Sequence, residues 1–314
     1  MLLRAIFYII AILIITACNK PQSKLISVKE LSDYPSASGL AYHDGRIYIM
    51  GDDAAYMLIM DTSFNIIDSI SVFDAAAKRI AKDRKADPEA IALINKKPGT
   101  ELLVIGSGSL SPYRDSCYNI NLPGKTIKRT GLDTFYQALK NVGLEQLNIE
   151  GAVIVGNNIV LSNRGNKSFP KNHLIIAPAL FWQNQAAANI KLIKAGTNPD
   201  TSTFAGVSGL DYSYLYDQLI LSVSEENTYN NYDDGAIGKS YLWIINNFSS
   251  KRRMSAVNPN TIIDLEETDQ RFKGHKIESV CIVSENKDEK QLILAADDDK
   301  GGSLLFKLQL IREK

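Results

Sequence analysis

Carboxylates recur at matching positions along this chain, and carboxylates gathered in one place could hold a metal ion. The matching positions belong to a repeated phrase, in which a small or acidic residue precedes a short apolar run and a second apolar run stops on polar residues. Three copies of the phrase begin with Glu89, Glu150 and Glu278, and two begin with Ser38 and Ser208. Oxygen ligands without a histidine or cysteine cluster favour Ca²⁺ or Mg²⁺ over zinc. The three glutamates are therefore the candidate metal ligands, with Ca²⁺ as the candidate ion.

The ends of the phrases supply a second set of polar residues. In an antiparallel hairpin, the start of the first strand and the end of the second lie at the same end. In a propeller the first strand of each blade lines the central channel, so both sets should meet at one channel mouth. Carboxylates that lie so close together raise each other's pKa unless a bound cation, an internal arginine or water compensates their charge. The candidate ligand-binding residues at this mouth are Asp52, Asp53, Arg164, Ser208, Glu225 and Asp297.

Each acid taken singly also suits an ordinary strand end, where Asp and Ser side chains hydrogen-bond the neighbouring backbone. Several acids that converge on a concavity favour a bound cation or polar ligand instead. Arg164 suits a salt bridge, and it could also receive a phosphate or carboxylate. Arg114 could reach the same mouth from a loop. His275, three residues before Glu278, is either a rim base for hydrolysis or an inert loop residue.

The elements that must position these residues are strands. The phrase recurs five times with a period of 50 to 70 residues, which indicates a propeller or an array. Alternating hydrophobicity, β-branched residues and turn residues give four strand-like segments in each of four repeats and three in the fifth. The sequence therefore predicts an all-β fold, a β-propeller of five four-stranded blades. Six blades are the alternative if the long fourth repeat hides one more.

The missing fourth strand of the last blade is expected from the N-terminus. Residues 24–31 read as an extra strand, and lending it to the last blade would close the ring and remove exposed sheet edges. Two stretches look helical, residues 73–86 and 133–145, with Asp133 as N-cap of the second. We expect them to be insertions over one rim of the propeller, or simply spacers.

The first residues of the chain predict export. A short basic start, Met1 to Arg4, precedes an unbroken apolar run from Ala5 to Thr16. This run suits the core of a signal peptide and is short for a membrane span. It closes on Ile15-Thr16-Ala17-Cys18, which looks like a bacterial lipobox, with an ordinary signal peptide or an uncleaved anchor as the alternatives. The predicted organisation is a lipoprotein signal peptide at 1–17, a lipidated Cys18 and tether at 18–24, and one propeller domain at 25–314.

Composition narrows the partners of the 314-residue chain. It is 45% apolar and 22% charged, with a formal net charge of zero, so no electrostatic footprint for nucleic acid is visible. The expected partners are the membrane, through lipid on Cys18, and an unidentified small molecule or protein. The expected location is the bacterial cell envelope at the outer membrane, because Asn19 argues against retention at the inner membrane. Cys117 and Cys281 lie in apolar segments of different repeats and are expected to be free and buried.

Short motifs resemble known families. The phrases Ser38-Gly39-Leu40, Asn148-Ile149-Glu150-Gly151 and Gly206-Val207-Ser208-Gly209-Leu210 are similar to those of phytase-like and esterase-like propeller proteins. More closely, the chain resembles a family of uncharacterised bacterial lipoprotein or secreted propellers with no assigned activity. The distant relatives imply Ca²⁺ at a channel mouth and phosphoester or ester cleavage. The phosphate cradle and calcium loops of a true phytase are absent from the sequence, which argues against phytase activity.

Two functions remain open, and with them the question whether the protein is an enzyme. The first is a lipid-anchored binding module that holds a ligand or partner at an acidic channel mouth. The alternative is a divalent-cation-dependent hydrolase of an ester, phosphoester or lactone, in which a metal-bound water attacks. Glycan recognition is a third reading, and it would need exposed aromatic residues such as Tyr229 and Tyr232 at the mouth.

Overall fold

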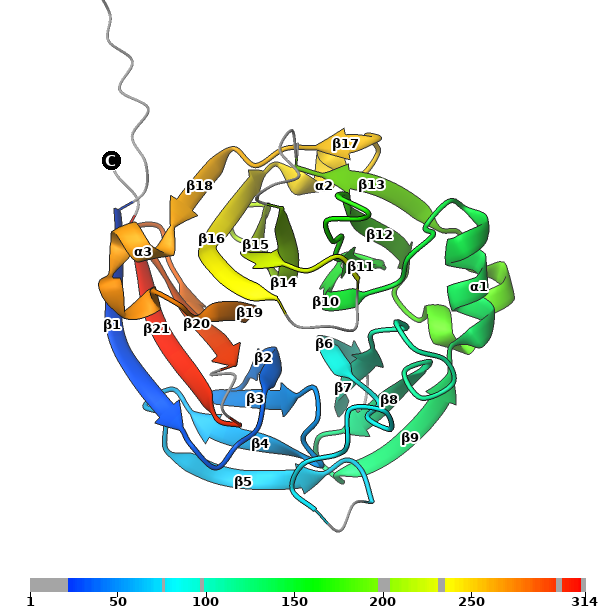
Figure 1. Ribbon diagram of the computed structural model, residues 1–314, viewed down its shortest axis with the longest axis horizontal. Coiled ribbons are helices and arrows are strands. Elements are labelled where there is room, and N and C mark those ends of the chain that lie inside the picture. Colours follow the sequence, from blue (N-terminus) through cyan, green and yellow to red (C-terminus); the bar gives the residue numbers. More distant parts are fainter. Residues whose placement is uncertain are drawn as a thin grey trace, which may run out of the picture.

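Five sheets, almost entirely antiparallel, surround a central channel in the computed structural model, and each sheet is built mainly from one sequence repeat (Figure 1). The structure describes residues 22–74, 77–96, 99–196, 204–230, 235–297 and 301–311. The fold is a five-bladed β-propeller, so the predicted fold class is confirmed and the six-bladed alternative is wrong. We number the blades one to five in chain order.

The strands of each blade run from the channel outward. Blade one holds β2 (Ala37–His43), β3 (Arg46–Gly51), β4 (Tyr56–Asp61) and β5 (Ile66–Ser71). Blade two holds β6 (Pro88–Lys96), β7 (Gly99–Gly106), β8 (Ser116–Asn121) and β9 (Thr126–Gly131). Blade three holds β10 (Ile149–Val155), β11 (Asn158–Asn163), β12 (Asn172–Pro178), β13 (Lys191–Ala195) and a parallel β17 (Ala256–Val257). Blade four holds β14 (Ala205–Ser213), β15 (Gln218–Asn227), β16 (Ala236–Asn246) and β18 (Thr261–Asp264). Blade five holds β19 (Lys276–Glu285), β20 (Glu289–Asp297), β21 (Ser303–Ile311) and β1 (Gln22–Leu31).

The N-terminal strand closes the ring, as predicted. β1 pairs antiparallel with β21 from Gln22 opposite Ile311 to Leu31 opposite Ser303. Residues 22–24 were expected in the tether, and they are instead part of this strand. Pairing satisfies the outer edge of β21, which would otherwise offer a row of free backbone groups to another chain.

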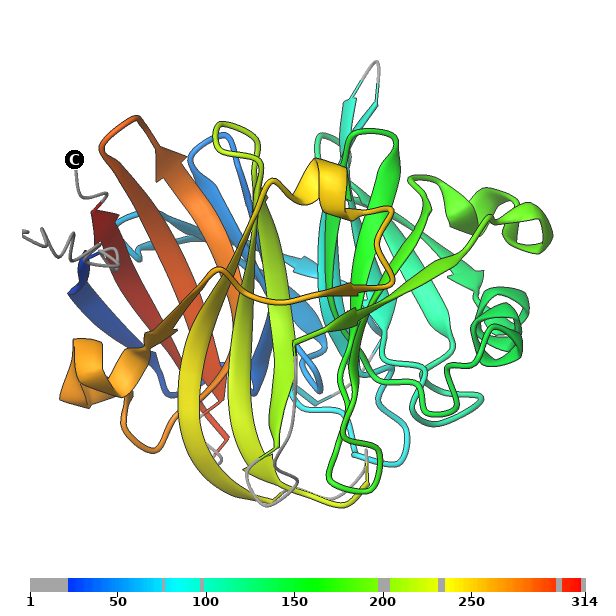
Figure 2. The same ribbon diagram turned by 90° about the horizontal axis from the view of Figure 1, so that it is seen from above.

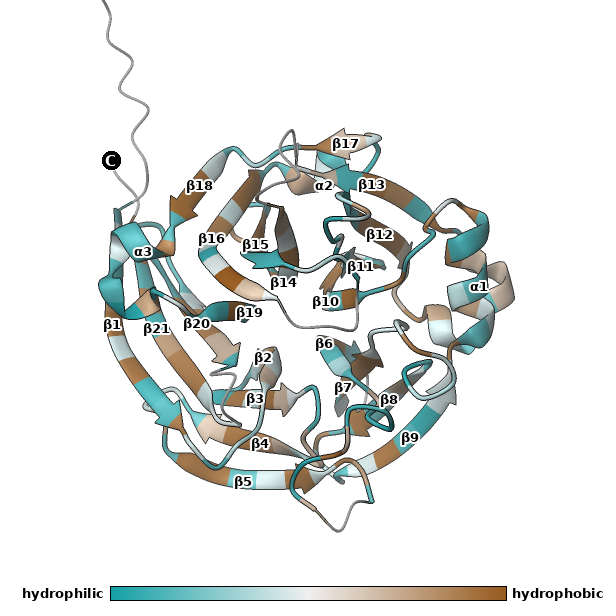
Figure 3. Ribbon diagram, in the orientation of Figure 1, coloured by the Kyte–Doolittle hydropathy of each residue, from teal (hydrophilic) through white to brown (hydrophobic). Residues whose placement is uncertain are grey.

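Apolar residues between neighbouring blades form the core. Four buried clusters each draw on adjacent blades, for example blades three and four around Trp243 and Phe248. Figure 3 shows hydrophobic residues along the strands of every blade. Full burial of one such side chain stabilises a fold by about 1.5 to 3 kcal/mol. Cys117 and Cys281 belong to this core and are free, as expected.

The five innermost strands, β2, β6, β10, β14 and β19, contact one another in a closed ring. Glycine residues allow neighbouring innermost strands to approach one another this closely. A Cβ atom at Gly209 would lie 2.8 Å from the Ser279 Cα and 2.9 Å from the Glu278 carbonyl oxygen. One at Gly151 would lie 2.9 Å from the Leu210 backbone nitrogen. These distances are too short for a Cβ atom, so Gly151 and Gly209 allow the close approach of β10, β14 and β19.

One of the two predicted helices forms. Helix α1 (Asp133–Asn141) buries Phe135, Tyr136 and Leu139, whereas Val142 is exposed and the N-cap is Leu132 rather than Asp133. The predicted helix at 73–86 is wrong in its described part, which forms turns and an isolated bridge between Ala54 and Arg79.

Short helical segments fill the remaining connections. They are α2 (Phe248–Lys251), α3 (Leu265–Thr268), η1 (Phe181–Gln183), η2 (Gln185–Ala187) and η3 (Gln270–Phe272). Across the ranges that the structure describes, no helix is long and apolar enough to span a bilayer. The predicted signal peptide at 1–17 and Cys18 lie outside these ranges.

Candidate functional site

A β-bulge aims the first residue of every phrase at the channel. In all five blades the register of the innermost strand shifts at this residue, which therefore has no partner of its own on the second strand. A bulge turns a side chain out of the regular alternation of a strand. The five bulged residues are Ser38, Glu89, Glu150, Ser208 and Glu278.

Four of these five residues line one cavity at the channel mouth, with a volume of about 100 Å³. Glu89, Glu150 and Glu278 therefore lie around a shared opening. The wall carries seven carboxylates and five cationic side chains, a difference of two. The carboxylates are Asp52, Asp87, Glu89, Glu150, Glu226, Glu278 and Asp297, and the cations are Lys82, Lys85, Arg114, Arg164 and Lys276.

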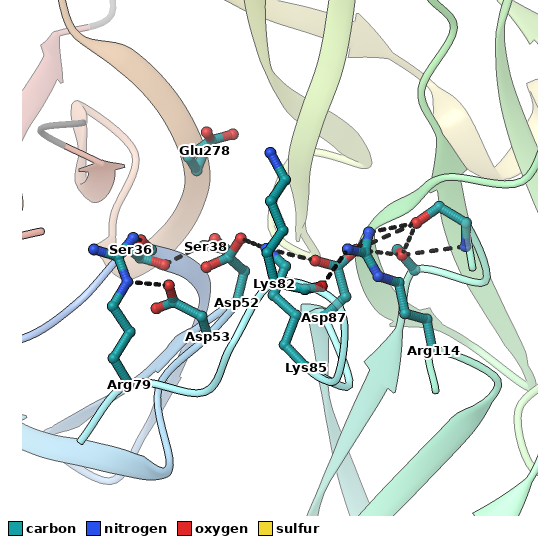
Figure 4. Close-up of polar contacts among 12 residues, drawn as sticks. Ser36, Ser38, Asp52, Asp53, Arg79, Lys82, Lys85, Asp87, Arg114 and Glu278 are labelled. Carbon is teal, nitrogen blue, oxygen red and sulfur yellow. Dashed lines mark hydrogen bonds and ion pairs between the residues drawn. The ribbon is translucent and has the colours of Figure 1, made fainter. Parts of the chain in front are cut away.

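A chain of ion pairs runs along the side of the cavity formed by blades one and two. The Lys85 ammonium contacts Asp52 and lies 2.8 Å from Asp87 Oδ1. Arg114 Nη1 then donates to Asp87 Oδ2 at 2.7 Å. Figure 4 shows these side chains side by side in a row, with the Arg79–Asp53 pair next to them. Asp52 nevertheless keeps one buried carboxylate oxygen, Oδ1, without a hydrogen-bond partner.

A second network occupies the side formed by blades three to five. Arg164 Nη2 donates to Glu226 Oε2 at 2.9 Å, and its other nitrogen, Nη1, lies 3.9 Å from Glu150 Oε2. Lys276 Nζ lies 3.0 Å from both Glu226 Oε2 and Glu278 Oε1. Glu278 is only 8% exposed, and its Oε2 atom has no partner. Arg164 thus takes the salt-bridge role that the sequence allowed.

Glu89 lies between the two networks. It makes no hydrogen bond or ion pair with any residue that the structure describes. Burial raises its pKa well above the ordinary value, and the charges of Asp87 and Glu150 add to this shift. Burial likewise raises the pKa of Asp52 to about 7 and that of Glu150 to about 8.

Glu226 is the exception among the buried carboxyls. Burial favours its neutral form, but Lys276 and Arg164 outweigh this effect and lower its pKa to about 2. Glu226 therefore stays ionised, whereas Glu89, Asp52 and Glu150 are poised to gain or lose a proton.

Three predicted mouth residues lie elsewhere. Ser208 is buried below the cavity, where its hydroxyl donates to the Ile277 carbonyl at 2.5 Å, because a short side chain at a bulge reaches the neighbouring strand first. Glu225 lies at a bulge between β15 and β16 and does not line the cavity; it accepts a hydrogen bond from the Tyr241 hydroxyl at 2.9 Å. Asp53 is held by Arg79 in an adjoining depression. Asp298, Asp299 and Tyr232 lie outside the described residues.

Sequence reasoning missed the lysines of the site. Lys85 comes from the segment expected to be helical, and Lys276 precedes Glu278 by two residues in a strand that begins earlier than expected. The spacing of Lys276 and Glu278 in one strand was a usable signal, because residues two apart lie on the same face. Asp87 was also missed.

The predicted metal ligands are not equally available. Glu150 and Glu278 face Arg164 and Lys276, whose positive charges oppose a bound cation. Glu89 is better placed, because one oxygen each of Glu89, Asp52 and Asp87 lie within 4.8 Å of one another. Lys85 now bridges two members of this group, so a cation would compete with its ammonium.

These pKa values predict how stability depends on pH. The folded protein keeps protons on Asp52 and Glu150 up to about pH 7 to 8, whereas unfolded carboxyls lose theirs near pH 4. The free energy of unfolding should therefore fall as pH rises from about 5 to 8, by about 1.4 kcal/mol per unit of pKa difference at most. Below about pH 4, protonation of Glu226 destabilises the fold in turn.

Thermal unfolding of the full chain between pH 4 and 9 measures this slope. Glu150→Gln cannot titrate and should flatten it, whereas Glu30→Gln, an exposed carboxyl on β1, should leave it unchanged. A melting temperature that rises between pH 5 and 8 would contradict the expectation.

Residues 33–310 of this chain match DUF6929, which is described as a family of unknown function. The chain belongs to this family. No curated protein matches it. The expected resemblance to propellers without an assigned activity is borne out to this extent.

Solved structures with a similar fold share little sequence with this DUF6929 chain. Glutaminyl cyclase from Myxococcus xanthus is 9% identical with a TM-score of 0.51, and the match covers 94% of this chain and 99% of that one. The tail fibre of Staphylococcus aureus phage P68 is 10% identical with a TM-score of 0.50, covering 93% of this chain and 53% of that one. The chain thus spans about half of the tail fibre. At these identities the likeness shows the fold alone.

Proposed function

We propose that this protein is a binding module that takes a small cationic ligand at the charged channel mouth, with Ca²⁺ as the first candidate. The ligand is held by carboxylates that the fold gathers around the axis but does not neutralise. The proposal rests on unsatisfied carboxylate oxygens within a cavity whose bases are already engaged.

The unpaired carboxylate oxygens of the cavity indicate that its ligand is positively charged. Asp52 Oδ1 and Glu278 Oε2 are buried without a partner, and a Glu89 oxygen lies within 4.8 Å of oxygens of Asp52 and Asp87. In contrast, Lys85, Arg114, Arg164 and Lys276 each contact at least one carboxylate. Buried acceptors without donors cost free energy, which a cation or a donor group recovers. The cavity therefore favours a cation over a phosphate or carboxylate.

Charge balance supports the same reading. With every group ionised, the seven carboxylates exceed the five bases by two charges. One divalent cation balances this excess, and so do protons on two carboxyls. Protons and cation then compete for the same oxygens, so the cation should bind more tightly at pH 8 than at pH 5.

The residues that would hold Ca²⁺ are Glu89 with Asp52 and Asp87, whose oxygens lie close together. Calcium accepts six to eight oxygen ligands in flexible geometry, so water completes its shell. Lys85 must withdraw from Asp52 when the ion binds, and its flexible stem allows this movement.

Calorimetric titration of the purified full chain with CaCl₂ tests the proposal. We expect saturable binding at pH 8, and Glu89→Gln should weaken it by roughly tenfold, about 1.4 kcal/mol, because the substitution removes one of the three clustered carboxylates. Glu30→Gln is the matched control and should bind as the wild type does.

Two outcomes would contradict the proposal. One is the absence of any binding heat for Ca²⁺ at pH 8. The other is binding that Glu89→Gln and Glu30→Gln leave equally intact, which would put the ion elsewhere.

Divalent-cation-dependent hydrolysis is the second candidate. The observation in its favour is Glu150, whose pKa of about 8 suits proton transfer near neutral pH. The cavity of about 100 Å³ holds only a few water molecules at about 30 Å³ each, so an ester would have to reach it from the adjoining depression around Arg79. For this reason binding ranks first.

Anchoring completes the proposed function. The lipobox ending at Cys18 supports lipidation and a place at the outer membrane of the bacterial cell envelope. The propeller would then present its mouth to a small molecule or protein from a fixed position on that membrane.

A further inference from the structure

The opposite end of the channel is a wide apolar funnel. Its volume is about 980 Å³, against about 100 Å³ for the charged mouth. Pockets that bind drug-sized molecules occupy about 300 to 1,000 Å³ and are lined mostly by apolar side chains. The funnel meets both criteria.

All five innermost strands build the wall of the funnel. Beyond the bulge, each inner strand contributes several residues to this wall, most of them apolar. The wall includes Leu40, Leu93, Val153, Leu210 and Ile282, one from each blade. The same strands thus carry charged residues at one end of the axis and apolar residues at the other.

The carboxylates near the funnel are already used by the fold. Asp211 accepts hydrogen bonds from the backbone nitrogens of Ile282 and Tyr212, each at 2.7 Å. Glu285 accepts from the Ser213 hydroxyl at 2.5 Å and from the Leu215 backbone. These acids join blades four and five. Because their oxygens already accept hydrogen bonds from the fold, a charged ligand is not needed to satisfy them.

Exposed apolar side chains continue from the funnel onto its rim. Tyr214 is 64% exposed, and its hydroxyl donates to the Ile154 carbonyl of the neighbouring blade. Tyrosine with a bonded hydroxyl and an open ring is typical of surfaces that meet an apolar–water boundary. By strand register, the exposed apolar residues at this end of their sheets include Leu180, Tyr214 and Leu215 near the channel, and Ile66 and Ile67 on β5, the outermost strand of blade one.

The first described residue also lies at this end of its sheet. Gln22 pairs with Ile311, which pairs with Glu289 at the turn between β19 and β20. That turn adjoins Ser284 and Glu285 on the funnel wall. Figure 2 shows the turns between the inner strands together at one end of the axis. Gln22 therefore lies on the outermost strand of blade five, at the end of the sheet that carries the β19–β20 turn.

We propose that the funnel faces the membrane and receives a phospholipid acyl chain. An anchor ahead of Gln22 would bring this face, with its exposed apolar rim, against the bilayer. Apolar burial and the large volume suit a hydrocarbon chain rather than a polar metabolite. The charged mouth then points away from the membrane. This orientation rests on the proposed lipid anchor, but it is independent of cation binding.

Photolabelling of the full chain in phosphatidylcholine–phosphatidylglycerol vesicles tests this orientation. The vesicles carry a trace of phospholipid with a diazirine on its acyl chain, and mass spectrometry maps the labelled peptides. We expect label on β6 and β10 around Leu93 and Val153, as well as ahead of Gln22. Val153→Trp narrows the funnel and should cut the label on β6 and β10 by roughly tenfold. Val142→Trp, on exposed α1, is the matched control and should leave it unchanged.

The position of the label separates the outcomes. Label confined to residues ahead of Gln22 overturns the funnel proposal and leaves the anchor standing. No label anywhere overturns both. Label on β6 and β10 that Val153→Trp does not reduce also overturns the funnel as the binding site. The calcium titration is unaffected by any of these results.

Discussion

Replacing Arg164 with methionine is expected to lower the free energy of unfolding by about 3 to 5 kcal/mol. Arg164 is 5% exposed and contacts Glu226 and Glu150. Methionine fills the volume but leaves the ionised Glu226 carboxylate with Lys276 as its remaining cation, which Glu278 also shares. Removing one partner from a buried ion network is among the costly single changes to a fold, because the remaining charges are then poorly balanced. Urea denaturation measures the effect.

The control for Arg164 is an arginine in an exposed ion pair. Arg271 pairs with Asp269 at 2.8 Å on the surface, and Arg271→Met should cause no measurable loss. Arg164→Met combined with Glu226→Gln should recover part of the stability, because the second change removes the negative charge that Arg164 had balanced. Equal losses for Arg164→Met and Arg271→Met would mean that the buried network does not hold the blades together.

Gly209→Ala is expected to destabilise the fold by roughly 1 to 3 kcal/mol and to leave Ca²⁺ binding at Glu89, Asp52 and Asp87 intact. The added methyl group would lie 2.8 Å from the Ser279 Cα and 2.9 Å from the Glu278 carbonyl. These are backbone atoms, so β14 and β19 must move apart. Glu278 sits on the displaced strand and would shift away from the cavity. Thermal unfolding and calcium titration of the same variant measure both effects.

Gly99→Ala is the matched control for this ring contact. A Cβ atom there meets nothing closer than 3.8 Å, and the residue lies at the start of β7, away from the channel ring. It should retain both stability and cation affinity. A loss of Ca²⁺ affinity in Gly209→Ala would contradict this expectation and put Glu278 among the residues that hold the ion.

The blades were predictable because their signals are local. Alternating apolar residues and turn residues such as Asp44-Gly45 fix each hairpin, and every described blade follows the predicted repeat. The shared mouth of Glu89, Glu150 and Glu278 followed from topology alone. What the repeat could not reveal is where a side chain goes after a bulge: Ser208 turns to the backbone of the next blade instead of the cavity.

The balance of charge at the mouth could not be read from the repeat. Lys85 belongs to a segment whose pattern suggested an amphipathic helix, with bases on the solvent side. Tertiary contacts override that preference: Ile80 donates to the Asp53 carbonyl at 2.7 Å, and Lys85 reaches Asp52 and Asp87. The predicted acidic mouth is therefore a mixed one, since its bases come from outside the phrases that supply its acids.

The pairing of β1 with β21 has a consequence for how the protein is made. Gln22 and Ile311 are neighbours in space although nearly the whole chain separates them. During synthesis the first strand emerges early and must stay unpaired until the last one has been released. Contacts of such long range form late and slowly. Blades one to four can therefore assemble as the chain appears, whereas the circle itself is completed only after translation of blade five has ended.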